Sequence, residues 1–155
     1  MNETNEDLLT GIEMHLVKAS TGKRFANFLI DTIVLYFIMG LIYTAIALVD
    51  PDMWTWMDAD QVLARVINWL IDAVLFGSLM GLIETITKGR SLGKLITGTK
   101  AIQQDGNPIT ASEAFARGFI RMVPFEAFSA LGSPCYPWHD KWTKTYVIDI
   151  KESAL

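Results

Sequence analysis

Two copies of one polar pattern are the residues in this chain that could do chemistry. The first copy is Arg24, Asn27 and Asp31, which lie three and four residues apart. The second copy lies forty-one positions further along and consists of Arg65, Asn68 and Asp72. An aspartate inside an apolar helix can exchange a proton for a monovalent cation. Desolvation raises the pKa of such a carboxyl group and a nearby arginine lowers it, so each pair could titrate as a coupled unit.

The residues around both copies predict membrane-spanning helices at 24–49 and 62–87. A helix rises about 1.5 Å per residue, so roughly 20 mostly apolar residues cross a hydrocarbon core about 30 Å thick. Residues 32–49 contain no charged side chain, and their apolar residues surround the whole helix instead of forming one stripe. The second segment is the weaker candidate because it contains Asp72 and Glu84.

Charge distribution predicts the orientation of the two helices. Basic residues precede the first helix and follow the second, whereas the connecting loop at 50–61 is acidic and carries tryptophans. Since Lys and Arg in short loops stay on the cytoplasmic side, both termini should be cytoplasmic and the 50–61 loop external. Residues 1–18 then form an acidic cytoplasmic segment. The net charge of −4 and the lack of a basic patch speak against nucleic-acid binding.

Composition also argues against catalytic and metal sites. The 155 residues contain one cysteine and two histidines, and 51% of them are hydrophobic. No nucleophile stands at a recognisable spacing from a base and an orienting group, and no cluster of metal ligands is present. We therefore expect neither an enzyme nor a bound metal or cofactor.

The chain changes character after the second helix. Residues 88–110 predict a basic turn followed by a strand at 95–102, and a second strand is expected at 145–150 within a final segment of turn and strand at 132–155. Between them, 111–131 predicts a helix capped by Thr110 and kinked or broken at Pro124. Its three charges favour an interfacial or re-entrant helix over a third span. The expected fold is one mainly α membrane domain over 1–155, with two antiparallel transmembrane helices, a third amphipathic or re-entrant helix and a small cytoplasmic β-sheet.

Four motifs in this order resemble the RDD family of bacterial membrane proteins, which is named for one arginine and two aspartates. They are Arg24-Phe-Ala-Asn-Phe-Leu-Ile-Asp31, Gly89-Arg-Ser-Leu-Gly-Lys94, Asp105-Gly106 before an arginine-bearing helix, and His139-Asp140-Lys141 with Thr145 before the last strand. The resemblance covers roughly 19–150 and makes Arg24, Asp31 and Asp140 the namesake residues. Arg90 departs from the usual Gln, and Leu95 stands where a basic residue is common. The family resemblance implies the bacterial cytoplasmic membrane and suggests transport of ions or small solutes.

The remaining motif residues have interpretations of their own. Gly89, Gly93 and Lys94 lack the full spacing of a phosphate-binding loop, so a basic turn that contacts anionic lipid head groups is the better interpretation. Asp140 is expected to form a salt bridge with Arg117 or Arg121, since buried charges need partners.

Two hypotheses from different classes follow. In the first, the repeated polar faces of two antiparallel helices form a seam that holds both aspartates, as in inverted-repeat transporters. Such a protein would move a monovalent cation or proton and would form a homo-oligomer, because two spans cannot enclose a water-filled path. In the second, the chain is a non-transporting scaffold or accessory subunit of a membrane complex. Arg24 then only anchors the cytoplasmic interface, while Asp31 pairs with Arg24 or with a helix terminus and so fixes helix packing.

Overall fold

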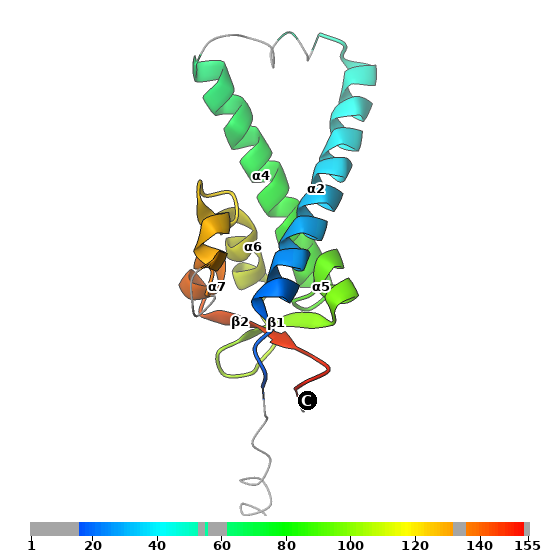
Figure 1. The fold of residues 1–155 in the computed structure, drawn as a ribbon. Helices are drawn as coiled ribbons and strands as arrows, with labels where there is room; N and C mark the ends of the chain where they lie inside the picture. Colours follow the sequence, from blue (N-terminus) through cyan, green and yellow to red (C-terminus); the bar gives the residue numbers. More distant parts are fainter. Residues whose placement is uncertain (1–15, 53–54, 56–61, 132–135, 154–155) are drawn as a thin grey trace, which may run out of the picture.

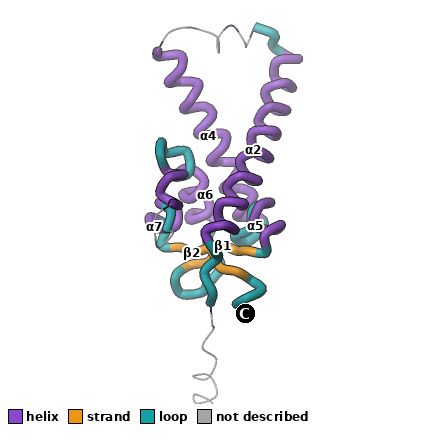
Figure 2. The backbone as a smooth tube through the Cα atoms, in the orientation of Figure 1, coloured by secondary structure: helices purple, strands orange, loops and turns teal. Residues whose placement is uncertain are grey.

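The computed structural model describes residues 16–52, 55, 62–131 and 136–153. Figures 1 and 2 show two long helices above a compact base made of shorter helices and a small sheet. In chain order the elements are α2 (Thr21–Val49), α4 (Val62–Ile86), α5 (Leu92–Thr97), β1 (Thr99–Gln103), α6 (Ala111–Ile120), the 3-10 helix η1 (Glu126–Leu131), α7 (Trp138–Trp142) and β2 (Thr145–Asp149).

Helices α2 and α4 run in opposite directions and diverge from the base in a V (Figure 1). Their lengths of 29 and 25 residues and their apolar composition are sufficient for each to span a membrane. The prediction of two long apolar helices joined to a small sheet is confirmed. The acidic loop predicted at 50–61 lies mostly outside the described residues, as does the acidic segment predicted at 1–18.

One face of α2 is buried and changes from polar to apolar along the helix. Its buried residues recur every three or four positions and are Arg24, Asn27, Asp31, Leu35 and Met39. The apolar end of this stripe packs against Phe76 and Met80 of α4. The polar end faces the base. This helix therefore joins an apolar contact between the long helices to a polar contact with the base.

Helices α4 and α6 approach closely because glycines face each other at their crossing. A Cβ atom on Gly118 of α6 would lie 3.1 Å from the Gly81 nitrogen and also against the Gly77 carbonyl group. A Cβ atom on Gly81 would lie 2.7 Å from Cα of Phe115. These are backbone atoms, which a side-chain rotation cannot move away, so the crossing depends on small residues.

The sheet confirms the two-strand prediction, with a correction to the first strand. β1 and β2 pair in an antiparallel register that runs from Thr99 opposite Asp149 to Gln103 opposite Thr145. The strand predicted at 95–102 was wrong for residues 95–98, because residues 95–97 belong to α5 and Gly98 is its C-terminal cap. The Ser91 side chain caps this helix, and Gly98 ends it with a φ of 70°. These two helix-end signals outweigh the β propensity of Ile and Thr.

The helix predicted at 111–131, with a kink or break at Pro124, is broken in the structure. α6 ends at Ile120, and η1 follows only from Glu126, with Pro124 in the turn between them. A proline lacks the N–H that would continue the helix and restricts the residue before it, so the break occurs in this turn. The predicted cap is present, because Thr110 and Glu113 form a reciprocal capping box.

Replacing Gly118 by alanine should destabilise the fold because the new methyl group meets backbone atoms of α4. We expect a cost of about 1–3 kcal/mol, the usual range for overpacking, seen as a lower thermal unfolding temperature in detergent. Gly40→Ala is the matched control, since nothing lies within 4 Å of its added Cβ. That variant should unfold at the wild-type temperature or above it. Equal losses in both variants would contradict the tight crossing.

Candidate functional site

Nine charged or titratable side chains gather where the base meets the long helices. We call them the charged cluster: Arg24, Asp31, Glu84, Lys94, Arg117, Arg121, Glu126, His139 and Asp140. They come from α2, α4, α5, α6 with its C-terminal cap, η1 and α7. With His139 neutral, four cations face four carboxylates. A balanced set of buried charges satisfies the requirement that such charges be paired.

Asp140 lies between two arginines. Arg24 Nη1 is 2.6 Å from Asp140 Oδ2, and Arg117 Nη1 forms an ion pair with Oδ1. Arg24 also donates to the carbonyl oxygens of Ala19 and Val147, each at 3.2 Å. Burial acts to raise the pKa of Asp140, but Arg117, His139 and Arg24 outweigh it and hold the pKa well below its usual range. Asp140 is therefore a permanently charged bridge between α2, α6 and α7.

Glu84, in the last turn of α4, is fully buried and contacts three cations. Lys94 Nζ lies 2.6 Å from Oε1, Arg117 Nε lies 3.0 Å from Oε2, and Arg121 Nη2 is more distant at 3.7 Å. Burial lowers the pKa of Lys94 to about 8; Glu84 opposes this shift, while Arg117 and Arg121 reinforce it. Sequence reasoning noted Glu84 only as a charge near a helix end and missed it as a site residue. The usable signal was a carboxylate in an otherwise apolar segment.

Asp31 is held by the turn that follows α4. It accepts hydrogen bonds from the Ser91 hydroxyl at 2.5 Å and from the Gly93 backbone N–H at 2.8 Å. Gly93 can approach so closely because it has no side chain. A Cβ atom at this position would lie only 2.7 Å from the Asn27 carbonyl oxygen. Arg121 Nη1 lies 3.7 Å from Asp31 Oδ2, beyond hydrogen-bonding distance. Asn27 faces the same segment, with its amide 2.9 Å from Thr99 Oγ1.

The residues of the motif Gly89 to Lys94 thus have structural roles, because they form a turn and bind side chains of α2 and α4. Gly89 has a φ of 93°, and its N–H donates to the Glu84 carbonyl group at 2.7 Å. Ser91 and Gly93 bind Asp31, and Lys94 binds Glu84. The predicted contact with lipid head groups does not fit Lys94, which is only 1% exposed. Its partner is a protein carboxylate.

Glu126 and His139 extend the cluster and were also missed as a pair. His139 Nδ1 lies 2.6 Å from Glu126 Oε1, and both side chains are buried. Burial lowers the pKa of His139, with Arg121 and Arg117 acting in the same direction, although Asp140 and Glu126 oppose them. Burial acts to raise the pKa of Glu126, but the hydrogen bond with His139 and the charges of His139 and Arg121 outweigh this effect. The pKa of Glu126 is therefore below its usual value. His139 was noted only as part of the motif His139-Asp140-Lys141, and Glu126 only as one of the charges in the helix predicted at 111–131, so their contact was not predicted.

The second copy of the repeated pattern lies elsewhere. Asp72 accepts a hydrogen bond of 2.5 Å from the Tyr43 hydroxyl group, and Arg65 is exposed near the opposite end of α4. Tyr43 follows Asp31 on the same helix by twelve residues, or about 18 Å of helix length. Asn68 is half-buried in the same upper part of α4. The structure therefore brings Arg24, Asn27 and Asp31 to the charged cluster and leaves Asp72 at another level, so the two aspartates do not share one seam.

A comparison with protein families identifies the chain. The RDD family matches residues 18–145, a span that includes every member of the charged cluster. The chain belongs to the RDD family. The three residues that the resemblance makes the namesakes differ in their partners: Arg24 pairs with Asp140, whereas Asp31 binds Ser91 and Gly93. The chain has no match among the curated proteins compared and none among the solved structures compared.

The salt bridge predicted for Asp140 is present in this RDD protein. The expected salt bridge was with Arg117 or Arg121, and Arg117 is the residue that makes it. Arg24 is a second partner that spacing along the chain could not indicate, because the two residues are separated by 116 positions. The alternative in which Arg24 pairs with Asp31 is not observed among the described contacts.

Replacing Arg117 by methionine should strongly destabilise this RDD protein. Its guanidinium is fully buried between Glu84 and Asp140, and its loss leaves both carboxylates with one fewer cation. Breaking a buried pair in this way costs about 3–5 kcal/mol, measurable as a large fall in the unfolding temperature. Lys141→Met, an exposed lysine on α7, provides the control and should change little. Similar unfolding temperatures for the two variants would contradict a stabilising bridge.

Stability should also fall as the pH drops below about 6.5, the ordinary pKa of histidine. Because the pKa of His139 is lowered in the folded state, the unfolded chain binds more protons just below that pH, and folding is then penalised. We expect the unfolding temperature to decrease between pH 7 and pH 5.5, and to decrease less in His139→Asn. The asparagine can retain a contact with Glu126 but has no proton to gain. An equal decrease in both proteins would exclude His139 as the source.

Proposed function

We propose that this RDD family protein spans the bacterial cytoplasmic membrane and exchanges a monovalent cation for a proton. Large apolar side chains cover the outside of both long helices; Phe37 of α2 is 68% exposed and Val74 of α4 is 58% exposed. Lipid or other subunits would remove this surface from water. Helices of this length and composition are therefore best accommodated in a bilayer.

The proposed orientation places the charged cluster and the sheet on the cytoplasmic side. Lys23 lies in the first turn of α2, and Lys88 and Arg90 follow the end of α4, all near the base. Asp50 and Asp52 follow the other end of α2. This distribution agrees with the rule that basic residues in short loops stay in the cytoplasm.

The observation that carries the transport proposal is the loose contact of Arg121 with two carboxylates on the spanning helices. Arg121 lies 3.7 Å from Asp31 of α2 and 3.7 Å from Glu84 of α4. Both carboxylates also have closer partners, so neither depends on a hydrogen bond from Arg121. We infer that Arg121 acts as a tethered cation near a position that a proton or a small cation can take in its place.

Exchange at this position would follow from charge balance. A monovalent cation entering beside Asp31 would displace Arg121, and a proton on the same carboxyl group would exclude the cation. The two species would therefore compete for one site, as antiport requires. Two spans cannot enclose a path for the ion, so the proposal includes a homo-oligomer whose subunits surround it.

The alternative function is that of a scaffold or accessory subunit of a membrane complex. It is supported by the saturation of most cluster groups: Glu84 and Asp140 each contact at least two cations at close range. A network of this kind can have a purely structural role, which is to hold the base against the long helices. The transport assay separates the two functions.

We expect purified wild-type protein in vesicles to carry proton-coupled Na⁺ or K⁺ flux, and Asp31→Asn to abolish it. Asparagine retains the volume of Asp31, can accept from the Gly93 N–H and can donate to a rotated Ser91 hydroxyl, so the fold should persist. Asp72→Asn is the matched control, because Asp72 lies beside Tyr43 and away from the cluster. Flux should therefore survive in this variant.

Oligomer size and unfolding temperature are measured in all three proteins to identify structural damage. Loss of flux in Asp31→Asn at unchanged size and stability supports the exchange site. Absence of wild-type flux under either cation gradient, or full flux in Asp31→Asn, contradicts it. The first of these results favours the accessory-subunit function.

A further inference from the structure

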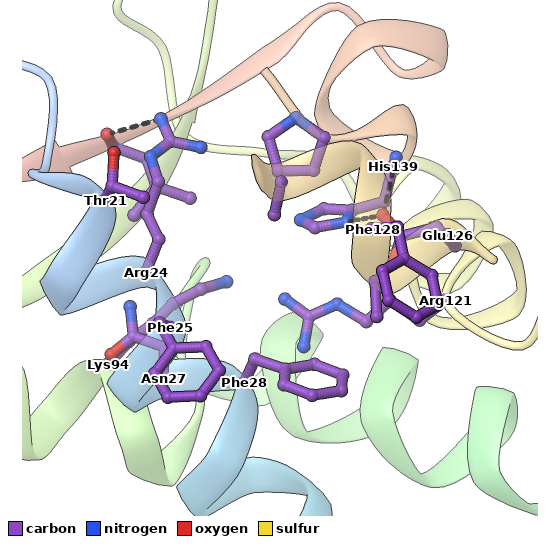
Figure 3. A pocket seen from close by; sticks show the side chains of 14 residues that line it. Thr21, Arg24, Phe25, Asn27, Phe28, Lys94, Arg121, Glu126, Phe128 and His139 are labelled. Atoms are coloured by element: carbon purple, nitrogen blue, oxygen red, sulfur yellow. Dashed lines mark hydrogen bonds and ion pairs between the residues drawn. The ribbon is translucent and has the colours of Figure 1, made fainter. Parts of the chain in front are cut away.

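A cavity of about 310 Å³ lies between the first turns of α2 and the segment that contains η1 and α7. Its rim is apolar and exposed: Phe25 is 59% exposed, Phe28 38% and Phe128 67%. Arg121 extends into the space between Phe28 and His139 (Figure 3). The volume is at the small end of the range for ligand pockets, about 300–1,000 Å³. The cavity therefore combines an apolar entrance with a charged interior.

Arg121 differs from the other two buried arginines in its hydrogen bonding. Arg24 and Arg117 donate directly to carboxylate, carbonyl or hydroxyl oxygens. Within the described part of the chain, the Arg121 side chain makes no hydrogen bond, and its Nε is buried without an acceptor. Arg117 Nη2 is also buried without an acceptor in this part, but Nε and Nη1 of Arg117 donate to carboxylate and hydroxyl oxygens. The side chain is only 8% exposed. A buried guanidinium donor without an acceptor is unfavourable and normally has a partner.

The charge of the cavity wall favours an anion as this partner. Arg24, Lys94 and Arg121 line it together with the carboxylate of Glu126. Arg24 and Lys94 are each paired with a carboxylate outside the lining, Asp140 and Glu84, so Arg121 is the lining cation without a hydrogen-bonded carboxylate among the described residues. The Glu126 carboxylate is already engaged by His139 at 2.6 Å. The charged cluster as a whole carries equal numbers of positive and negative charges. A ligand with one negative charge therefore disturbs this balance less than a ligand with two. The site therefore suits a singly charged head group.

We propose that the cavity binds a single alkyl chain with a monoanionic head group, the head group on Arg121 and the chain along the phenylalanine rim. A carboxylate or a phosphodiester can accept two parallel hydrogen bonds from the Nε and Nη atoms of one guanidinium. The apolar rim would bury the first methylene groups of the chain. The rest of the chain would leave the cavity past Phe25 and Phe128. This site does not depend on cation exchange.

The test measures binding in detergent by native mass spectrometry, without an ion gradient, so its result is independent of the flux assay. The probes are decanoate, lysophosphatidylglycerol and, as an uncharged single-chain control, monodecanoylglycerol. We expect wild-type protein to bind at least one anionic probe and to bind monodecanoylglycerol at least about tenfold more weakly, as a charge-assisted hydrogen bond predicts. The anionic probe that binds identifies the head group as a carboxylate or a phosphodiester.

Arg121→Gln should weaken binding of the anionic probe by about tenfold or more, because the guanidinium is lost. Arg90→Gln, which removes an arginine that does not line the cavity, should bind as wild type does. If Arg121→Gln does not fold, Ala127→Phe blocks the entrance from an exposed position and should give the same loss. Wild-type affinity in the folded cavity variants, or no binding of either anionic probe to wild type, overturns the proposal.

Discussion

Arg117 joins two fully buried carboxylates, Glu84 and Asp140, and most of the base is arranged around this bridge. Lys94 completes the pairing of Glu84 and Arg24 that of Asp140. The result is an alternating row of cation and anion that links α5, α4, α6, α7 and α2. Each charge would be costly to bury alone, so each element is stable in place only when its neighbour is also in place. The small base can therefore be specific in its fold with few buried apolar residues.

Such pairing requires backbones to approach closely, and glycines make this possible at two points. Gly93 brings the start of α5 against the Asn27 carbonyl group, which lets its own N–H reach Asp31. Gly118 brings α6 against α4 one residue after Arg117, which places that guanidinium within reach of Glu84. The charge network and the glycine contacts are thus parts of one constraint. A side chain at either glycine would separate groups that need each other as partners.

Local signals were sufficient for the elements whose formation depends on nearby residues. The lengths of the two apolar helices, the Thr110 cap and the break near Pro124 could all be predicted, because each is set within a few residues of chain. Helix α5 was not predicted, and its last residues were assigned to the first strand, because the Ser91 and Gly98 helix ends compete with β-forming residues. The partners of the buried charges could not be predicted beyond a choice of candidates. Arg24 and Asp140 lie 116 positions apart, and only the packing of the whole base brings them together.

The repeat itself explains why equal motifs acquire unequal surroundings. Helices α2 and α4 run in opposite directions, so the arginine-bearing ends of the two copies lie at opposite ends of the V (Figure 1). The chain after α4 folds around the first copy, where Ser91 and Gly93 bind Asp31 and Asp140 binds Arg24. Asp72 of the second copy instead contacts Tyr43 of α2. A polar pattern within a long apolar helix therefore acquires its chemical environment from the segments that fold against it, and the described segments after α4 fold at the end that carries Arg24.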